Sequence, residues 1–351
     1  MKIKYGCMCY AVPQKLLRHV AENSDAERRG ILTGQMQHST RLREKRAASG
    51  KEAAGKMAGS WPLHRQIFDG QGQTFLPGRL LRDEDAAPAR DKPANDAYDN
   101  VGIALQFFSD VLGRNSVDGK GMRIDTTVHY GYAFANAMWT GGQMIVGDGD
   151  SRDVRELAKS LGIIAHELTH GVTQHLISGG LGVVQMAGQP PLLKGEAGAL
   201  NESLSDVCAS MVKQWHAGQD VTAADWLMGE DILAPRVGRA VRSLKDPGNT
   251  DLTWSQDDQI KDYRRFKPTD DVHKASGIAN YAFYVTAMEL GGHTWDALAP
   301  IWLKGFERLR ARASFLDAAH ATVAVAAAVH SAGSRPHQAV KAGWKAANVL
   351  R

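Results

Sequence analysis

The sequence predicts an α+β protein of two domains, the first rich in β-strands and the second mainly helical. Between Trp61 and Asp150, three short β-like runs (HRQIFD, MRIDTTVHY and QMIVGDGD) surround one helix, which we expect over residues 97–112. From Asp153 onward, helical periodicity continues almost to the end of the chain. A chain of 351 residues is long enough for two such domains, each with its own hydrophobic core. We place the divisions at residues 1–57, 58–186 and 187–351.

The composition argues against two classes of protein. Lysine and arginine total 42 against 38 acidic residues, and the resulting net charge of +4 is too small to suggest a nucleic-acid binder. No apolar run reaches the roughly 18 residues that a membrane span requires. The best candidate, residues 318–329, is short and is interrupted by His320 and Thr322, so we expect a buried helix there.

The N-terminus and the cysteines leave the cellular compartment open. The first residues are charged but lack the sustained apolar region of a Sec-type leader, so we expect a cytoplasmic protein or export by another route. The three cysteines are Cys7, Cys9 and Cys208, an odd number that argues against a disulfide scaffold. Cys208 lies in an apolar helical stretch, and we expect it in the core.

The N-terminal part of the chain, to about Met57, differs from the rest. A short helix is expected over residues 13–22, with Leu16, Leu17 and Val20 on one side. The polar, basic tract at residues 41–60 has no apolar period, and we interpret it as a flexible linker open to proteases. A solvated surface arm or a nucleic-acid-binding tail is the alternative.

One amphipathic helix carries the central motif. Residues 153–177 (DVRELAKSLGIIAHELTHGVTQHLI) have apolar side chains three and four apart, which predicts a helix. Residues four apart lie on one face of a helix, so His166 and His170 can point at the same ion. With Glu167 between them they form His-Glu-x-x-His, a motif typical of two zinc ligands and a carboxylate general base. A bare match of this kind also arises by chance among surface or core histidines.

A catalytic zinc site needs a third protein ligand. The longer motif HExxHxxGxxH is excluded because Thr173 stands where its glycine should be, and His175 lies off the ligand face. In the next helix, GALNESLSDVCASMVKQW, Glu202 and Asp206 are four apart on a face away from the apolar stripe. They can serve as a metal ligand and as the residue that fixes the tautomer of a zinc histidine. The alternative is a solvated acidic face.

Several ordered segments resemble the thermolysin-like (M4, gluzincin) metallopeptidases, especially their protealysin-like branch with a short N-terminal propeptide. These segments are RNSVDGKGM, FANAMWTGGQMIVGDGD, AHELTHGVTQ, GALNESLSD, VRSLKDP and VHKASGIANYAF, with weaker agreement through LGGHTWDALAPIW to AVKAGW. The resemblance covers roughly residues 65–349, and this ordered set is far more specific than the histidine motif alone. It implies a β-rich N-terminal domain and a helical C-terminal domain, with the active site between them.

The resemblance implies a zinc-dependent endopeptidase acting on proteins or peptides. It assigns His166, His170 and Glu202 as the zinc ligands, the His2Glu set that thermolysin itself has. It assigns Glu167 as the base that deprotonates the attacking water, and His273 as the residue that stabilises the oxyanion. It also implies a preference for bulky apolar residues at P1′, immediately after the bond that is cut.

The resemblance assigns supporting residues as well. Asp206 and Asn201 resemble the residues that hold the two zinc histidines. The positions that resemble substrate contacts are Asn136, the backbone of Ala137, Arg242 beside the S1′ pocket, and the apolar pocket walls Ile163 and Val241.

The chain departs from the family pattern around the oxyanion. The position of the family's oxyanion tyrosine is occupied by Leu193, inside the altered stretch GQPPLLKGEA. The aspartate expected five residues before the oxyanion histidine is replaced by Pro268, and either Asp270 or Asp271 can take over its orienting role. The usual VHxNSG reads VHKASG, so one polar loop contact is lost. These changes bear on catalytic efficiency more than on the type of reaction.

The calcium positions of the family have also changed. The positions that correspond to its paired calcium site are Gly162, Lys213, Asp225, Leu227 and Glu230. Only two of the five are carboxylates, and a lysine would place a positive charge inside the cage. A double-calcium site needs more anionic oxygen ligands, so we predict that it is absent.

The resemblance and the break in composition together predict that residues 1–57 are a short prosegment that inhibits the enzyme. The stretch CMCYAVPQKLL can lie extended across the active-site groove, because Pro13 biases Val12 toward the extended region. Cys7 or Cys9 could reach the zinc, since thiolate is a good zinc ligand, against the plainer reading of two terminal thiols.

Two alternatives to the endopeptidase remain. An aminopeptidase would need an anchor for a free substrate amine, and no such anchor is recognisable. A zinc-binding module that binds peptides with weakened catalysis is the second alternative, although it would need neither Glu167 nor His273. We expect a monomer that spans no membrane and binds no nucleic acid.

Overall fold

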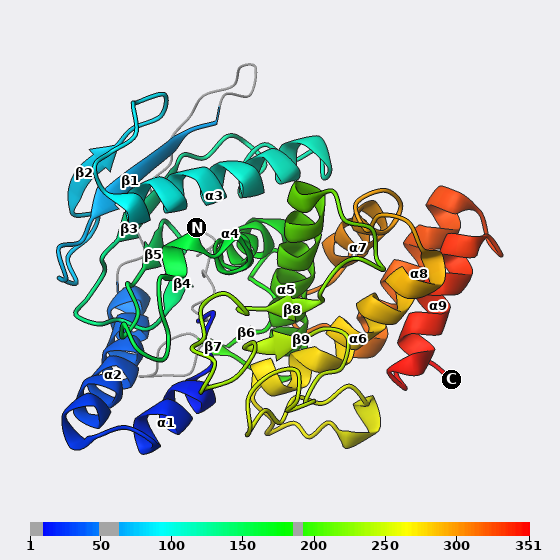
Figure 1. Cartoon of the computed structure of the whole chain (residues 1–351). Coiled ribbons are helices and arrows are strands. Elements are labelled where there is room, and N and C mark those ends of the chain that lie inside the picture. The colour runs from blue at the N-terminus through cyan, green and yellow to red at the C-terminus, as the bar shows by residue number, and fades with distance from the viewer. Residues whose placement is uncertain (1–9, 49–62, 185–191) are drawn as a thin grey trace.

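The computed structural model describes residues 10–48, 63–184 and 192–351 (Figure 1). The predicted divisions after residues 57 and 186 therefore lie outside the described residues, as do Cys7 and Cys9. The architecture confirms the predicted fold class: the N-terminal part contains a sheet, and the C-terminal part is helical.

A mixed sheet organises the N-terminal part. Within the described residues it has the strand order β2-β1-β3-β5-β4, with β1–β3 and β3–β5 parallel and the two outer pairs antiparallel. Its strands are β1 (Arg65–Asp69), β2 (Arg79–Arg82), β3 (Ile124–Val128), β4 (Ala137–Trp139) and β5 (Met144–Val146). Strands β1, β3 and β5 lie within the three predicted β-like runs, whereas the outer strands β2 and β4 were not predicted. The outer position of β4 leaves one of its edges free to pair with another chain segment.

Helix α3 (Lys92–Asp110) packs on β1 and β3 of this sheet. It begins five residues before the predicted start and ends two residues earlier than predicted. Asp91 caps it by accepting a hydrogen bond from the Ala94 amide at 2.9 Å. The first turn is polar, so apolar periodicity did not reveal it. The second oxygen of Asp91 contacts His129 Nε2 at 2.9 Å, and Asp148 contacts His129 Nδ1 at 2.8 Å, so one imidazole links α3 to the end of β5.

Helix α4 (Leu161–Leu176) carries the histidine motif and is shorter than predicted. It begins at Leu161 and not near Asp153, because the Ser160 side chain caps it at the Ile163 amide. The residues before it form a 3₁₀ turn, η1 (Leu157–Lys159), and a bridge between Val154 and Leu233. The helix-like spacing in that region therefore reflects burial in a loop and not a helix.

The C-terminal part is a set of helices packed in sequence, α5 on α4, α6 on α5 and α9 on α6 (Figure 1). These helices are α5 (Gly195–Ala217), α6 (Val272–Leu290), α7 (Leu298–Glu307), α8 (Phe315–His330) and α9 (Arg335–Ala346). The stacked rings of Trp302 and Trp344, 5.7 Å apart, lie in its core. Helix α8 contains the apolar run 318–329, and its buried Thr322 accepts a hydrogen bond from the Trp344 indole at 2.8 Å. No helix in the described part of the chain is long and apolar enough to cross a membrane.

Short elements connect these helices and flank the space between the two parts. They are the hairpin β6 (Val183–Val184) and β7 (Leu192–Leu193), the pair β8 (Leu227–Met228) and β9 (Arg242–Ser243), and the turn η2 (Tyr263–Arg265).

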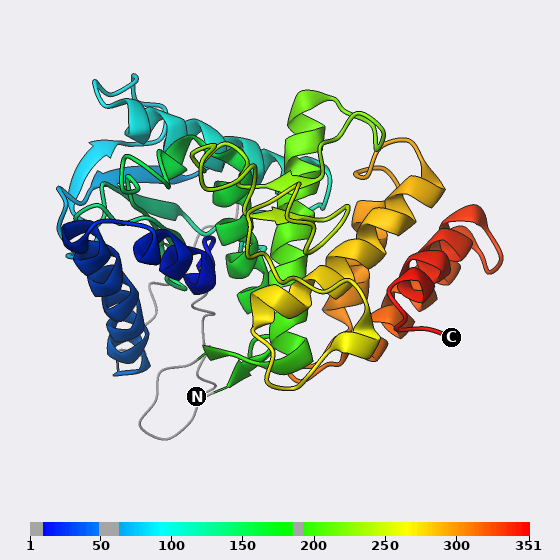
Figure 2. The ribbon, with the colours of Figure 1, turned by 60° about the horizontal axis from the view of Figure 1, so that its bottom comes forward.

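Two N-terminal helices lie against the sheet-containing part, α1 (Gln14–Glu22) and α2 (Ala26–Ala48) (Figure 2). Helix α1 confirms the predicted short helix. The interpretation of residues 41–60 as a flexible linker is wrong for residues 41–48, because helix α2 continues to Ala48. The sequence does not reveal α2 because few of its residues are apolar, with Leu32 fully buried and Met36 partly buried, and because Gly30 and Gly34 lower its helix propensity.

Candidate active site

Helices α4 and α5 bring the three predicted ligands together. The Nε2 atoms of His166 and His170 lie 3.1 Å apart, and the Glu202 carboxylate is 3.6 Å from the first and 3.5 Å from the second. All three side chains are buried. One ligand atom from each lies within 4.8 Å of the others, which is the spacing of groups that can hold one metal ion.

The acceptors behind the two histidines indicate the tautomer of each ring. His170 Nδ1 lies 3.0 Å from the carbonyl oxygen of the Asn201 side chain, which can only accept, so Nδ1 carries the proton. His166 Nδ1 lies 2.9 Å from the Asp206 carboxylate, which likewise accepts. In each neutral ring the Nε2 atom is therefore left with a lone pair that points toward the other histidine and toward Glu202.

This arrangement of acceptors fits a cation. Two nitrogen lone pairs and a carboxylate meet in a buried space, and among the described residues neither Glu202 oxygen receives a hydrogen bond. Buried acceptors facing one another without a donor are costly, and a divalent metal ion relieves that cost. The donor set of two imidazoles and a carboxylate, all deprotonated at the facing atoms, suits zinc.

Glu167 lies beside this group, held by the edge strand of the sheet. Its Oε2 accepts a hydrogen bond from the Trp139 amide of β4 at 2.6 Å, while its Oε1 is buried with no hydrogen-bond partner in the described structure. Burial raises the pKa of Glu167 above its usual range. Helix α4 packs closely on β4 here, since a Cβ at Gly171 would lie 3.1 Å from both Trp139 and Val117.

Asp206 connects the histidines to the C-terminal part. Its two oxygens accept from the Arg242 guanidinium at 2.7 and 2.9 Å, and one of them also accepts from Asn280 at 2.9 Å. Burial alone would raise the pKa of Asp206, but Arg242 and His166 outweigh it and hold that pKa below its usual range. Sequence reasoning missed Asn280. Its signal was its position on α6, seven residues and about two turns after His273.

His273, at the start of α6, also faces the group. Its Nε2 lies 3.3 Å from Glu202, and its Nδ1 lies 3.0 Å from Asp271 Oδ1. Asp271 also caps α6 by accepting from the His273 amide at 2.9 Å, whereas Asp270 pairs with Lys274 at 2.7 Å. Of the two aspartates left open by the sequence, Asp271 is therefore the one that contacts the histidine.

Leu193, which stands at the position of the family's oxyanion tyrosine, is buried and packs with Val272 and Val183. A leucine at this position offers no hydroxyl to a developing charge. The first four residues of the altered stretch, 188–191, lie outside the described residues.

Three residues ahead of α1, residues 10–12, lie against the residues beside the proposed metal ligands. The carbonyl of Tyr10 lies 3.2 Å from His273 Nε2, and the carbonyl of Ala11 accepts from Arg242 at 3.0 Å. The Val12 amide donates to Asn136 Oδ1 at 2.9 Å, and the Val12 carbonyl accepts from Asn136 Nδ2 at 2.9 Å.

Further contacts fix this segment on the catalytic part. The Ala11 amide donates to the carbonyl of Ala137 on the free edge of β4, at 3.4 Å. The side chain of Tyr10 is buried in an apolar cluster whose other members are Tyr130, Phe134, Met138 and Ile145. The predicted substrate contacts Asn136, Ala137 and Arg242 thus all touch one segment of this same chain.

The predicted pocket walls, Ile163 and Val241, are both fully or almost fully buried. Ile163 lies in the first turn of α4, and Val241 immediately precedes Arg242 on β9.

The predicted calcium position is occupied by a lysine ammonium. Lys213 Nζ donates to the carbonyl of Leu227 at 3.0 Å, to Asp225 at 3.3 Å and to Glu230. The aliphatic part of Lys213 lies against Gly162, where a Cβ would be 3.3 Å from its Cδ atom. A single positive charge therefore stands among the oxygens that a calcium ion would use.

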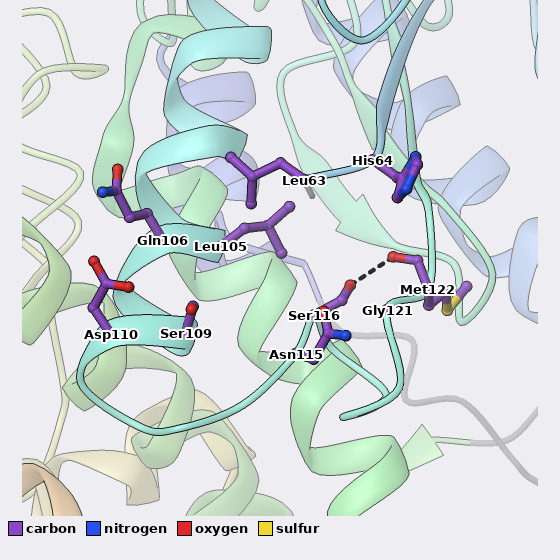
Figure 3. A pocket seen from close by; sticks show the side chains of 10 residues that line it. All are labelled: Leu63, His64, Leu105, Gln106, Ser109, Asp110, Asn115, Ser116, Gly121 and Met122. Atoms are coloured by element: carbon purple, nitrogen blue, oxygen red, sulfur yellow. Dashed lines mark hydrogen bonds between the residues drawn. The ribbon is translucent and has the colours of Figure 1, made fainter. Parts of the chain in front are cut away.

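A cavity of about 320 Å³ lies elsewhere, between the C-terminal half of α3 and the loop before β3 (Figure 3). Leu105, Gln106 and Ser109 line it from α3, and the Ser116 hydroxyl opposite them donates to the Met122 carbonyl at 2.6 Å. None of the predicted site residues lines it. The chemistry belongs instead to the cleft that residues 10–12 fill.

Comparison with known proteins follows the same division of the chain. Residues 22–174 match the family model described as the thermolysin metallopeptidase catalytic domain, and residues 192–349 match that of its alpha-helical domain. The first match begins inside the N-terminal helices, earlier than the residue 65 at which the sequence resemblance was expected to start.

Individual relatives agree with these matches. An extracellular metalloprotease of Pectobacterium carotovorum subsp. carotovorum is 36% identical over 84% of this chain and 83% of its own length. Protease PrtS of Photorhabdus sp. (strain Az29) is 37% identical over 68% of this chain and 64% of its own length. The solved precursor of protealysin, a metalloproteinase from Serratia proteamaculans, superposes with a TM-score of 0.83 and 31% identity, covering 97% of this chain and 100% of its own.

Proposed function

The chain belongs to the thermolysin family of metallopeptidases and is a metalloendopeptidase, and from that premise we propose that it uses one zinc ion, with Glu167 as general base. The proposed zinc ligands are His166, His170 and Glu202. The observation that supports them is the meeting of two histidine lone pairs and a carboxylate in a buried space, where neither Glu202 oxygen receives a hydrogen bond from the described residues. Zinc in this position would polarise a scissile carbonyl and make its water more acidic.

The proposed roles of the protein groups follow from their positions. Glu167 has one oxygen fixed by the Trp139 amide and the other without a partner in the described structure, so the second oxygen can take a proton from water and deliver it to the leaving amine. His273, held by Asp271, can donate a hydrogen bond to the oxyanion. A donor of this kind commonly contributes about 3 kcal/mol to the transition state.

Asp206 and Asn201 are proposed as the residues that keep the zinc histidines in the binding tautomer. Each contacts the Nδ1 atom of one histidine, and Arg242 and Asn280 fix Asp206 in turn. A Glu202→Ala protein should lose most of its zinc in metal analysis. Zinc at full stoichiometry in that protein would remove Glu202 from the ligand set.

The proposed catalytic roles are tested by a peptidase assay on wild type and Glu167→Gln. Glutamine keeps the shape of the side chain but provides no base, so the variant should bind zinc, fold and lose nearly all hydrolysis. Comparable rates for the two proteins would show that another group activates the water. A wild type that binds peptides and zinc but hardly cleaves them would favour the weakened peptide-binding module, for which Leu193 is the motivating observation.

We also propose that the N-terminal segment is an inhibitory prosegment that imitates a substrate. If His273 receives the carbonyl of the bond to be cut, Tyr10 stands at P1 and Ala11 at P1′, where Arg242 holds the Ala11 carbonyl. Asn136 then binds both backbone groups of Val12 at P2′. A segment bound in this register excludes substrates by occupying their backbone hydrogen bonds.

N-terminal sequencing tests the prosegment. Active preparations should begin between Ile31 and Trp61, and Glu167→Gln expressed alone should stay full length. A fully active enzyme that still starts at Met1 would end this proposal. Whether Cys7 or Cys9 meets zinc concerns residues outside the described structure.

The preference for bulky apolar P1′ residues is a further proposal. Its support is the pair of buried apolar residues Ile163 and Val241 next to Arg242. A peptide-library profile should be dominated by Leu, Ile, Phe or Val at P1′. A profile dominated by charged P1′ residues would contradict the pocket assignment.

We make three further proposals, on calcium binding, secretion and the oligomeric state. The ammonium of Lys213 supports the absence of a double-calcium site. The name of the extracellular relative from Pectobacterium supports secretion, by a route that the sequence does not identify. We also propose that the enzyme is a monomer.

A further inference from the structure

The N-terminal helices bind the catalytic part at a second point, outside the cleft. The guanidinium of Arg28, in the first turn of α2, enters a space between Asp150 and Asp153. Its Nη2 atom forms an ion pair with Asp150 Oδ2 and lies 2.9 Å from Asp153 Oδ2. The side chains are almost buried, with exposed fractions of 11% for Arg28, 3% for Asp150 and 8% for Asp153. We call Asp150 and Asp153 together the acidic socket.

The acidic socket is built by the catalytic part and does not depend on Arg28 for its shape. Asp150 Oδ1 accepts from the backbone amides of Arg152, Asp153 and Val154 at 3.0, 2.7 and 3.0 Å, which closes a tight loop. The Asp153 carbonyl accepts from the Ala234 amide at 2.9 Å, which fastens this loop to the one after β8.

The charges of the acidic socket leave room for one cation. Asp153 uses its Oδ1 for Arg236 and its Oδ2 for Arg28, whereas Arg28 is the one cation that pairs with Asp150 among the described residues. Burial alone would raise the pKa of Asp150, and the Arg28 guanidinium together with the loop amides holds it below the usual range. Without Arg28, a nearly buried carboxylate would face the space with no cation, which is an unfavourable state.

The number of free oxygens identifies the kind of cation. Once the loop amides and Arg236 are satisfied, one oxygen from each carboxylate faces the position of Arg28. Calcium takes six to eight oxygen ligands, which this space does not offer. Here a single nitrogen of Arg28, Nη2, contacts both carboxylates, and its buried Nε has no hydrogen-bond partner among the described residues. A guanidinium is more weakly hydrated than an ammonium, so it suits a nearly buried pair of oxygens.

We propose that the acidic socket is a guanidinium-binding site which Arg28 fills in the precursor and which an arginine side chain of a protein substrate fills in the processed enzyme. The second half of this inference rests on the proposed function, because it requires that the N-terminal helices leave. It adds a contact outside the cleft to the recognition of long substrates, whereas short peptides that fill only the cleft do not reach it.

The precursor half is tested in the full-length chain with Glu167→Gln, which prevents processing. Arg28→Gln, Asp150→Asn and the double variant are compared by hydrogen exchange of the α1 amides. Asparagine keeps the acceptor for the three loop amides and removes only the charge. Each single variant should exchange about 10-fold faster, and the double variant no faster than either, as expected for two groups that act as a pair.

The matched control is Asp25→Asn, which removes a charge from the same helix pair. Asp25 lies 3.9 Å from Arg152, and both side chains are more than half exposed, so exchange should hardly change. Multiplicative effects of Arg28→Gln and Asp150→Asn, or an equal effect of Asp25→Asn, would overturn the pairing.

The substrate half is tested on the enzyme after its own processing. Long peptides share one cleavage sequence and carry either arginine or citrulline, its neutral isostere, at successive positions beyond the cleft. At one position arginine should lower KM about 10-fold relative to citrulline, and Asp150→Asn should abolish that difference without changing hydrolysis of a short peptide. Equal rates for arginine and citrulline at every position would overturn the substrate half.

Adding calcium tests whether the acidic socket binds a metal ion instead of a guanidinium. Calcium at millimolar concentration should not stabilise the processed enzyme through Asp150. If calcium stabilised the wild type and Asp150→Asn removed this effect, the acidic socket would be a metal-ion site and not a guanidinium site. Failure of the proposed function would be distinct from these outcomes, because no peptide would then be cleaved at all.

Discussion

Replacing Lys213 by methionine tests whether its ammonium stabilises the surrounding oxygens as a bound calcium ion would. Methionine keeps most of the length and apolar contact of the side chain and removes the charge. The variant would leave Glu230 and Asp225 facing each other and the Leu227 carbonyl without their common donor. The side chains of Lys213, Glu230 and Asp225 are 19%, 26% and 50% exposed, so the site lies between the surface and the core.

The size of the effect follows from that intermediate position. Breaking a fully buried pair costs about 3–5 kcal/mol, and breaking an exposed pair costs about 0–1 kcal/mol. Burial already raises the pKa of Glu230 even with Lys213 present, so Glu230 can partly escape the loss by taking up a proton. We therefore expect a loss of about 2 kcal/mol, or roughly 3–5 °C in melting temperature for a protein of this size.

The assay is thermal unfolding with zinc kept saturated, with and without a calcium-selective chelator. Wild type should respond weakly to the chelator, Lys213→Met should melt lower in both conditions, and Lys213→Glu should melt lower still but recover with millimolar calcium. The control is Lys159→Met, which breaks an exposed pair with Glu156 and should hardly change the melting temperature. An unchanged Lys213→Met, or a large drop of wild type in the chelator, would refute the reasoning.

Two further predictions concern carboxylates that hold a histidine. Asp148 and Asp91, on opposite sides of the ring, raise the pKa of His129 to about 9, so the stability from this charge is complete below about pH 6.5 and is lost as the pH rises through 9. After allowance for screening at a partly exposed ring, His129→Gln should remove about 1–2 kcal/mol at pH 6 and little at pH 10 in urea unfolding, and equal losses at both would contradict it. Asp271→Asn should keep the helix cap but lower kcat about 10-fold with KM little changed, whereas Asp270→Asn, whose partner is a lysine, should leave both near wild type in the same kinetics.

The grouping of the three proposed metal ligands was predictable because the information for it is local. Two histidines four apart in a helix share a face wherever that helix is placed, and the same holds for Glu202 and Asp206 one helix later. What the sequence left open was the choice between Asp270 and Asp271. That choice depends on the backbone turn before α6, where Asp271 becomes the cap and its carboxylate comes to lie beside the histidine ring.

The parts that sequence reasoning missed depend on distant partners. Helix α2 shows little apolar period because it rests on the catalytic part largely through polar contacts, such as Arg28 with Asp150, 122 residues away. The outer strand β4 is only three residues long and is fully buried, which leaves no alternation to detect. The early start predicted for α4 failed for a related reason, since residues before Leu161 are buried by loops from the C-terminal part.

The bond from the Trp139 amide to Glu167 has a mechanical consequence. Strand β4 offers the Ala137 carbonyl to the chain in the cleft and, two residues later on the same edge, the Trp139 amide to the carboxylate. The segment at residues 10–12 and the proposed general base, Glu167 of α4, thus both form hydrogen bonds with one short strand. Any flexing between the two parts of the molecule would carry both together and leave their separation unchanged. Such flexing would instead change the distance from these groups to His273, which lies on α6 in the C-terminal part.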